Sequence, residues 1–213
     1  MKTFSFVTAL AIAIGGAACA SGTGTTGSAV AATGAPAVEP VSATIGAPAP
    51  GFTLPDASGQ PVKLSDFAGK VVVLEWINPD CPFVVRHANA GTMKSLAQKY
   101  SGNVVWIGIN STNYMDSAAN AKWIADRALP YTVLDDHTGA VGRAYNAKTT
   151  PHMYVIDTTG KLVYAGAIDD DNGGTKGASA VNYVDAALAE VTAGKPVSVA
   201  ETKPYGCSVK YAK

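Results

Sequence analysis

The chain has 213 residues, of which 47 % are hydrophobic and 15 % are charged, and its formal net charge is zero. This composition is typical of one globular domain with tails, and it excludes a wholly disordered chain. The balanced charge argues against a polyanionic partner such as nucleic acid held by bulk charge. Three cysteines are too few for a disulfide-built scaffold.

Residues 1–20 are predicted to be an export signal. Lys2 supplies the positive charge, residues 4–14 are mostly apolar but too short to span a bilayer, and Ala18-Cys19-Ala20 has the small-residue pattern of a cleavage site after Ala20. An alternative interpretation makes Cys19 a lipidated cysteine, although Gly16 stands where such sites usually carry Leu. In both cases the protein is expected to be exported, periplasmic or otherwise extracytoplasmic. It is expected to contact a membrane only if Cys19 is lipidated.

Residues 21–44 are predicted to be a low-complexity linker, because they are mostly small residues and Pro. A folded domain is predicted over 45–194, and it opens with a hairpin around the turn residues 56–59. Hydrophobic periodicity then predicts strands at 71–76, 104–109, 131–134, 153–156 and 162–165, and helices at 82–100, 117–128, 139–145 and 181–191. This order predicts an α/β fold with a mixed central sheet, flanking helices and an N-terminal hairpin. A loose tail is expected over 195–213.

Cys81 lies between the predicted strand 71–76 and a predicted helix that begins at Pro82. Pro is favoured at the first helical position, so Cys81 is expected to be the N-cap, beside unpaired N–H groups and the positive end of the helix dipole. Such a terminus stabilises an anion by at most about 2 kcal/mol, which lowers a thiol pKa by roughly 1.5. We therefore expect a reactive thiol, although free cysteines are often buried and inert.

Four stretches of the sequence carry a resemblance to a known family. They are GAPAPGFTLPDASGQPVKLSDFAGKVVVLEW, NPDCPFVVRH, TTPHMYVIDTTGKLVYAGAIDD and GCSVKY. Over about residues 45–192 the chain resembles the thioredoxin-like superfamily, specifically its peroxiredoxin-like (alkyl hydroperoxide reductase/thiol-specific antioxidant, redoxin) branch, in a poorly characterised subgroup with one site cysteine. The resemblance implies a thioredoxin-like fold and thiol chemistry. It also implies that Pro151, preceded by Thr150, is a cis-proline that faces Cys81 across a cleft.

The sequence departs from this family at the site itself. The thioredoxin motif has a second cysteine three residues after the first, and Val84 stands there. The usual peroxiredoxin pattern P-x-x-x-T-x-x-C has Leu74 and Asn78 in place of its Pro and Thr. Neither a local dithiol relay nor ordinary peroxiredoxin chemistry can therefore be transferred to Cys81.

Two further residues are candidates for the site. His152 follows the expected cis-proline; as an imidazolium it would favour a thiolate, as a neutral ring it could be a base or a metal ligand, and otherwise it is a surface histidine. Cys207 is either a resolving cysteine or a tail cysteine that is free or structurally paired. An extended chain from Gly194 to Cys207 can reach up to about 43 Å, enough to cross a domain of about 40 Å. A mobile tail could thus bring Cys207 to Cys81.

Neighbouring polar residues are expected to be structural. Arg86 and His87 lie too far round the helix to cover the thiol. Residues 169–171, three consecutive aspartates, are expected to form a solvated acidic loop.

The leading hypothesis is an extracytoplasmic thiol-based oxidoreductase with antioxidant activity. Cys81 attacks a peroxide or a protein disulfide, and Cys207 or an external thiol reductant resolves the product. No cofactor or metal is expected. Two alternatives remain: a copper-binding module in which Cys81, His152 and Cys207 hold Cu(I), and a thioredoxin-fold binding domain without redox activity.

Overall fold

The structure is a computed structural model that describes residues 42–213. The predicted export signal, Cys19 and the linker up to residue 41 lie outside the described residues. The strands are β1 (Thr53–Pro55), β2 (Pro61–Lys63), β3 (Val71–Trp76), β4 (Val104–Asn110), β5 (Thr132–Asp135), β6 (Thr149–Thr150), β7 (His152–Ile156), β8 (Leu162–Gly166) and β9 (Cys207–Ser208). The helices are α1 (Pro82–Ala90), α2 (Thr92–Lys99), α3 (Ser117–Arg127), α4 (Ala140–Ala144) and α5 (Tyr183–Thr192), with short 3-10 helices η1 (Leu64–Phe67) and η2 (Gly177–Ser179).

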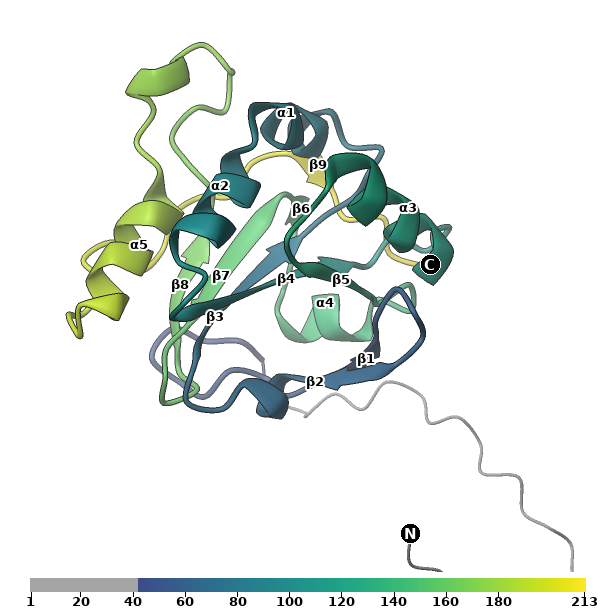
Figure 1. The fold of residues 1–213 in the computed structure, drawn as a ribbon, viewed down its shortest axis with the longest axis horizontal. Coiled ribbons are helices and arrows are strands. Elements are labelled where there is room, and N and C mark those ends of the chain that lie inside the picture. The colour runs from purple at the N-terminus through teal and green to yellow at the C-terminus, as the bar shows by residue number, and fades with distance from the viewer. Residues whose placement is uncertain (1–41) are drawn as a thin grey trace, which may run out of the picture. The chain divides into compact units, whose positions relative to one another are not determined.

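A five-stranded sheet in the order β5-β4-β3-β7-β8 forms the centre of the domain (Figure 1). Strands β3, β4 and β5 are parallel, whereas β7 is antiparallel to both β3 and β8. The predicted mixed sheet and the opening hairpin, β1–β2, are thus confirmed. Every residue of β3 is buried, which explains its nearly continuous apolar sequence, because both faces of the strand are covered.

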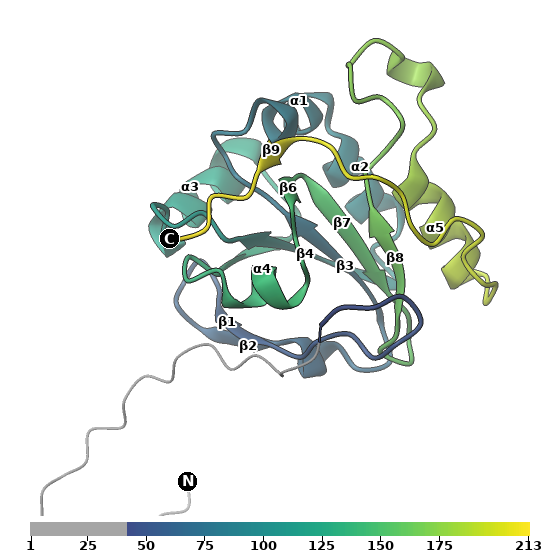
Figure 2. The same ribbon diagram turned by 180° about the vertical axis from the view of Figure 1, so that it is seen from behind.

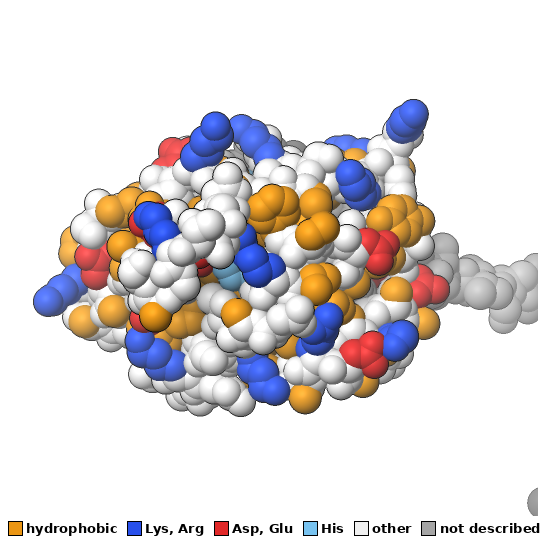
Figure 3. Space-filling model, turned by 90° about the horizontal axis from the view of Figure 1, so that it is seen from above, with side chains coloured by type: hydrophobic (Ala, Val, Ile, Leu, Met, Phe, Trp, Pro, Cys, Tyr) orange, Lys and Arg blue, Asp and Glu red, His pale blue; other side chains and the backbone are white. Residues whose placement is uncertain are grey.

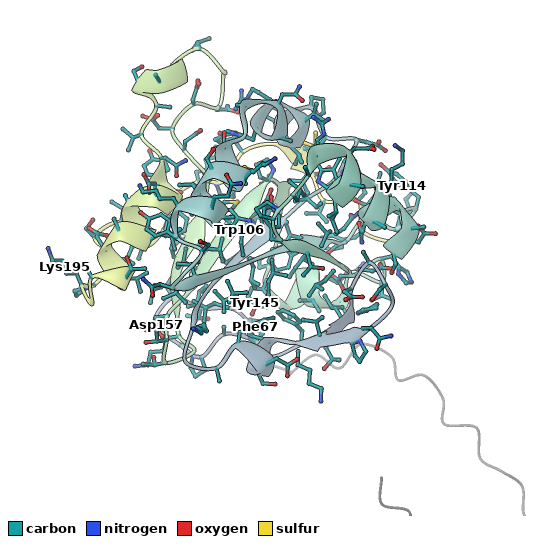
Figure 4. The ribbon with its side chains drawn as sticks, viewed as in Figure 1. Phe67, Trp106, Tyr114, Tyr145, Asp157 and Lys195 are labelled. Carbon is teal, nitrogen blue, oxygen red and sulfur yellow. The ribbon has the colours of Figure 1, made fainter. Side chains whose placement is uncertain are left out.

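Two hydrophobic layers cover the sheet. On one face Val71 and Val73 pack with residues of α2 and α5, and this layer includes Trp106. On the other face Leu74 packs with β1 and α4, and this layer includes Tyr145 (Figure 4). The alternation of β3 side chains between the two layers fixes its register against both neighbours.

The helix predicted over 82–100 is in fact two helices. Gly91 separates α1 from α2 and has a left-handed φ of 67°. Glycine adopts this conformation without a Cβ clash, so it ends α1 and lets the chain start a new helix in another direction. Within residues 42–213, none of the helices combines the length and apolar character needed to cross a lipid bilayer.

The C-terminal tail is not loose, contrary to the prediction. Residues 200–212, which we call the strap, cross the domain from the edge of β8, over β6, to the side of α3 (Figure 2). The Ala165 N–H donates to Ala200 O at 3.0 Å, the Val209 N–H to Lys148 O at 3.1 Å, and the Asn113 N–H to Lys210 O at 2.9 Å. These backbone hydrogen bonds hold the strap at points along its length, which short-range sequence patterns do not reveal.

Candidate active site

Cys81 is the N-cap of α1, with extended φ and ψ of −79° and 120°, and Pro82 occupies the first turn. Its side chain is almost fully buried, with 1 % exposed. The Thr150–Pro151 peptide bond is cis, and the Cys81 thiol donates a hydrogen bond to Thr150 O at 2.9 Å. The strand-to-helix junction and the loop before β7 thus meet at the Cys81 sulfur.

Cys207 lies beside this junction because β9 pairs with β6. The pairing is antiparallel and sets Cys207 opposite Thr150 and Ser208 opposite Thr149. Cys207 is half-buried and packs against the small hydrophobic cluster that contains Cys81. Both cysteines are free thiols. The structure therefore assembles two thiols from distant parts of the chain, one in the strap and one at a helix terminus.

The surroundings of Cys81 favour its thiolate. Burial is the largest single influence and raises the pKa of Cys81, but hydrogen bonds from the Cys207 and Thr150 side chains and from the N–H groups of Val84 and Cys207 outweigh it, so the pKa is lowered. The Thr150 hydroxyl is buried and has no hydrogen-bond partner within the geometric limits among residues 42–213, so it is available to donate to the Cys81 sulfur. Cys81 is thus the more acidic of the two thiols.

Cys207 has the opposite character. Burial, followed by its hydrogen bond to Cys81 and the charge of that neighbour, raises the pKa of Cys207 to about 11. Cys207 therefore holds its proton more tightly than Cys81 does. The thiol that ionises more readily is suited to attack the oxidant, and the neighbouring thiol that keeps its proton is suited to the later resolving step.

His152 does not join the two thiols. Its Nδ1 lies 3.3 Å from the Lys148 N–H donor and 3.0 Å from the Tyr154 hydroxyl, and its hydrogen bonds do not include Cys81. Burial, assisted by the charge of Lys148, lowers the pKa of His152 to about 4, so the ring is neutral at pH 7. Of the interpretations open for His152, neither a protonated ring beside Cys81 nor a surface position agrees with the structure, because the ring is buried against Tyr154 with 6 % exposed.

The copper alternative lacks an assembled ligand set in the described part of the chain. Over residues 42–213 no group of three or more His, Cys, Asp or Glu side chains is arranged to hold a metal ion. The ring of His152 faces a separate cavity of about 320 Å³ that Glu201 and Thr202 of the strap also line. The three candidate ligands thus do not converge.

Arg86 and His87 do not contact the thiol; as expected they have a structural role, which is to bind Tyr205 of the strap. His87 Nε2 lies 3.0 Å from the Tyr205 hydroxyl, and Arg86 stacks on the Tyr205 ring with its guanidinium carbon 5.7 Å from the ring centre. The Tyr205 hydroxyl donates a short hydrogen bond to Asp169. Arg86 also donates to the carbonyl of Asp171 at 2.8 Å. Tyr205 is two residues before Cys207, so this cluster fixes the strap next to the site.

The acidic loop is more buried than the sequence suggests. Asp169 is 7 % exposed and Asp171 is 8 % exposed, so the prediction of a solvated loop is wrong for both. Asp169 accepts from Tyr205, and Asp171 accepts the N–H groups of Thr175 and Lys176. These partners replace water, which allows the carboxylates to be buried.

Glu75 is a buried carboxyl group that the site prediction did not include. It accepts hydrogen bonds from Trp106 Nε1 at 2.9 Å and from the Tyr131 hydroxyl at 3.1 Å, and burial raises its pKa to about 7. A cavity of about 20 Å³ lies between Glu75 and Val84, the residue at the position of the missing second cysteine. The signal for Glu75 was its position as the one charged residue in an otherwise apolar strand.

The outer surface near the site is mixed in character. Tyr114 is 60 % exposed and donates to Asp80, the residue before Cys81, at 3.2 Å (Figure 4). Seen from the α1 end of the molecule, basic, acidic and hydrophobic side chains are interspersed (Figure 3). This surface agrees with the balanced formal charge.

A thiol at a helix N-cap that faces a cis-proline, on a mixed sheet with flanking helices, defines a thiol oxidoreductase of the thioredoxin-like class. Residues 45–165 match the model of the AhpC/TSA family. This match spans more than half of the chain, and the protein belongs to that family. The predicted subgroup with one site cysteine stays a prediction.

Relatives of known sequence and structure agree with this assignment. Thioredoxin-like protein YneN of Bacillus subtilis is 28 % identical over 118 residues, covering 55 % of this chain and 68 % of the relative. Peroxiredoxin Q, chloroplastic, of Triticum aestivum is 35 % identical over 124 residues, and the match spans 54 % of this chain and only about half, 55 %, of the wheat protein.

Among solved structures, an uncharacterized conserved protein from Geobacillus kaustophilus has a TM-score of 0.71 at 29 % identity and covers 84 % of this chain and 97 % of its own. A hypothetical protein from Sinorhizobium meliloti 1021 has a TM-score of 0.71 at 28 % identity, and the match covers 82 % of this chain and 97 % of the other. A candidate thiol:disulfide interchange protein DsbE from Chlorobium tepidum has a TM-score of 0.52 at 30 % identity, and the match covers 58 % of this chain and 85 % of the other.

Proposed function

We propose that this protein is an exported two-cysteine thiol oxidoreductase in which Cys81 is the nucleophile and Cys207 is the resolving thiol. The observation that carries the proposal is the β6–β9 pairing, which sets Cys207 opposite Thr150, the residue whose carbonyl accepts the Cys81 hydrogen bond. The opposite pKa shifts of the two thiols support the same assignment, since one is suited to attack and the other to remain protonated until needed.

The reaction consists of an oxidising step and a resolving step. With a hydroperoxide, the Cys81 thiolate attacks one peroxide oxygen, an S–O bond forms, the O–O bond breaks, and the leaving oxygen takes up a proton to depart as water or an alcohol. The sulfur loses two electrons and becomes a sulfenic acid. The Cys207 sulfur then attacks the Cys81 sulfur, an S–S bond forms, and water leaves with the Cys207 proton.

A disulfide oxidant follows the same course with sulfur in place of oxygen. Cys81 forms a mixed disulfide and releases one thiol, and Cys207 displaces the second thiol from Cys81. In both cases two equivalents of an external thiol reduce the Cys81–Cys207 disulfide and become oxidised to a disulfide themselves. The cycle requires no cofactor.

Intact-mass analysis before and after one equivalent of hydrogen peroxide tests this proposal, followed by non-reducing peptide mapping. Wild type should lose two hydrogens and yield a peptide that links Cys81 to Cys207. Cys207→Ser, the matched control, should instead gain one oxygen at Cys81. If oxidised wild type retains both thiols, or forms only intermolecular links, Cys207 is not the resolving thiol.

Export is part of the proposal. It is supported by residues 1–20, in which a positive charge, an apolar stretch and a small-residue cleavage pattern follow one another. The mature chain is expected to begin at Ser21, or at a lipidated Cys19 in the alternative. Mass analysis of the N-terminal peptide from the exported fraction distinguishes these forms. An intact Met1 in that fraction would remove the argument for cleavage.

A further inference from the structure

The cavity of about 320 Å³ beside His152 is separate from the two thiols, since neither cysteine lines it. Three segments that are distant in sequence border it: residues 43–45, residues 145–148 between α4 and β6, and residues 201–204 of the strap. Strands β7 and β8 supply the remaining lining residues. Its volume is at the lower end of the range of sites for small organic molecules, about 300–1,000 Å³.

Backbone hydrogen bonds hold the two segments that cross over β8 at the cavity. On one side the Gly46 N–H donates to Leu162 O at 2.8 Å. On the other side the Thr202 N–H donates to Ala165 O at 3.2 Å, which attaches the strap to the same strand. The cavity is therefore formed by the fold itself, as most sites for small molecules are.

Much of the cavity lining is apolar. Tyr145 and Tyr154 both line it, and their hydroxyls are engaged elsewhere: Tyr145 donates to Pro50 O at 2.7 Å, and Tyr154 donates to Tyr145 O at 2.8 Å. The two tyrosines thus offer ring carbons rather than free hydroxyls. Ile45 and Leu162 also line the cavity. A ligand with an apolar body fits this lining.

His152 adds a buried hydrogen-bond donor to this lining. Its Nδ1 accepts from the Lys148 N–H at 3.3 Å, a backbone group that only donates, and the nearby Tyr154 hydroxyl gives its proton to a backbone carbonyl. A neutral imidazole whose Nδ1 accepts a hydrogen bond carries its proton on Nε2. The side chain is 6 % exposed, so the Nε2–H group is largely withdrawn from bulk water.

This Nε2–H group has no acceptor among residues 42–213, because the hydrogen bonds of the ring involve Nδ1. Within these residues, the side-chain atoms that lack both a partner and accessible space belong to Asn120 and Thr150. Nε2 therefore borders accessible space, and the space that His152 lines is the cavity. Because an unpaired buried donor destabilises a fold, Nε2–H requires an acceptor from outside the chain.

The charges around the cavity favour a negatively charged acceptor. The exposed Lys148 side chain lines the cavity and takes part in none of the ion pairs within residues 42–213. Its positive charge acts on the His152 ring. Glu201 also lines the cavity but has no such influence on the ring. An anion at Nε2 would therefore have an ammonium group as its charged neighbour.

We propose that this cavity binds a small organic carboxylate. The carboxylate accepts from His152 Nε2–H beside the Lys148 ammonium, and the apolar body of the ligand packs against Tyr145 and Tyr154. The site forms no covalent bond with the ligand and does not depend on the redox chemistry of the two cysteines. Strap residues 201–204 border it, so the ligand would also contact the segment that carries Cys207.

Titration of the full chain with phenylacetate tests the inference, with backbone amide NMR as the readout. Saturable shifts are expected at residues 43–45, 145–148 and 201–204. Lys148→Met should weaken phenylacetate binding by about threefold, as for an exposed charge pair. Binding of phenylacetamide, the uncharged analogue, should not change. Lys63→Met is the matched control, because Lys63 is exposed on β2 and does not line the cavity.

His152→Phe keeps an aromatic ring but removes the donor, so it should weaken phenylacetate binding at least about tenfold. Because this variant also takes the acceptor away from the Lys148 N–H, nitrogen NMR of the wild-type imidazole provides a measurement without substitution. The ring should carry its proton on Nε2, and the Nε2 resonance should shift when phenylacetate is added.

Three results would overturn the inference: amide shifts that do not saturate or that lie away from the cavity, a proton on Nδ1 of His152, and equal weakening of phenylacetate binding by Lys148→Met and Lys63→Met. In the first case water is the partner of Nε2–H. Saturable binding that depends on both Lys148 and His152 supports the inference. None of these results bears on the roles proposed for Cys81 and Cys207, so the two proposals succeed or fail separately.

Discussion

The β3–α1 junction and the strap each contribute one cysteine to the site, but they do so in different ways. The junction is continuous in sequence: a buried strand, Cys81 and Pro82 follow one another, and the helix terminus comes with them. The strap reaches the same point from the far end of the chain, through the pairing of Cys207 with Thr150. Local structure thus prepares the nucleophile, whereas tertiary structure supplies its partner.

His152 and Cys207 sharpen this contrast because both lie near Thr150. His152 is close in sequence, but its ring packs against Tyr154, two residues along the same strand, and its hydrogen bonds go to Lys148 and Tyr154 rather than to Cys81. Successive side chains of a strand alternate between faces, so His152 and Tyr154 share one face. Cys207 is distant in sequence and lies against the thiol. Proximity in the chain was therefore a poor guide to the second member of the site.

The largest expected effect separates the two cysteines by their roles. Cys81→Ser should abolish catalytic consumption of hydrogen peroxide with a thiol reductant, because no thiolate remains to attack. Cys207→Ser should still be oxidised in the first turnover, because the nucleophile is intact. Stopped-flow measurement of one turnover and of steady-state turnover checks both. A Cys81→Ser protein with wild-type turnover would invert the assignment.

Glu75→Gln should alter the stability of the domain without undocking the strap. The folded pKa of Glu75, about 7, is above its ordinary value of 4.5, so the folded state retains a proton that the unfolded state loses. The wild-type free energy of unfolding should therefore fall as pH rises from about 4.5 to 7, by about 3 kcal/mol from this group alone. Urea unfolding at pH 5 and pH 8 should show that Glu75→Gln removes most of this fall. If the free energy of unfolding of Glu75→Gln falls with pH as much as that of wild type, Glu75 is not the group responsible.

Tyr205→Phe should act on the strap and leave the rest of the domain nearly unchanged. It removes the hydroxyl that donates to Asp169 but keeps the ring against Phe83, and such a hydrogen bond to a carboxylate contributes about 1–3 kcal/mol. Amide hydrogen exchange should quicken at Cys207 and Ser208, and β3 should keep its protection. Tyr100→Phe is the control, since Tyr100 donates a comparable hydrogen bond to Asp185, at 2.7 Å, away from the strap. If amide exchange at Cys207 and Ser208 quickens equally in both variants, the Tyr205 hydroxyl does not specifically stabilise the docked strap.

Titration should reveal the coupling between the two thiols. In Cys81→Ser, the Cys207 thiol no longer faces a neighbouring negative charge, so its pKa should fall from about 11, by about 1. Burial, the larger cause, persists and keeps the pKa above its ordinary value. Ultraviolet thiolate absorbance against pH measures the change, and Cys19 must be absent from the sample. A pKa that stays at about 11 would mean that the thiols do not interact.

The smallest effect is expected at His152. Its ring is neutral and its hydrogen bonds go to Lys148 and Tyr154, so His152→Ala should change the pKa of Cys81 by less than about 0.3. Iodoacetamide alkylation of Cys81 across pH in Cys207→Ser, with and without His152→Ala, provides the measurement. A clear rise in the pKa of Cys81 would restore His152 to the site.

Much of the fold could be predicted because its signals are local. The apolar run 71–76 was bounded correctly as β3, and the hairpin at β1–β2 followed from its turn residues. The division of the helix at Gly91 was missed because the hydrophobic spacing continues across it. The buried state of Asp169 was missed because its partner, Tyr205, comes from the strap.

The sequence by itself determined the strand, the helix start and the position of Cys81 between them, because hydrophobic periodicity and the preference of Pro for the first helical turn act over a few residues. Only the tertiary structure decided what surrounds the thiol. Cys207 reaches Cys81 because β9 pairs with β6, Gly206 permits the close approach, and Tyr205 packs against Phe83 and Arg86. Each of these depends on contacts between distant residues, and such contacts leave no periodic pattern in the chain.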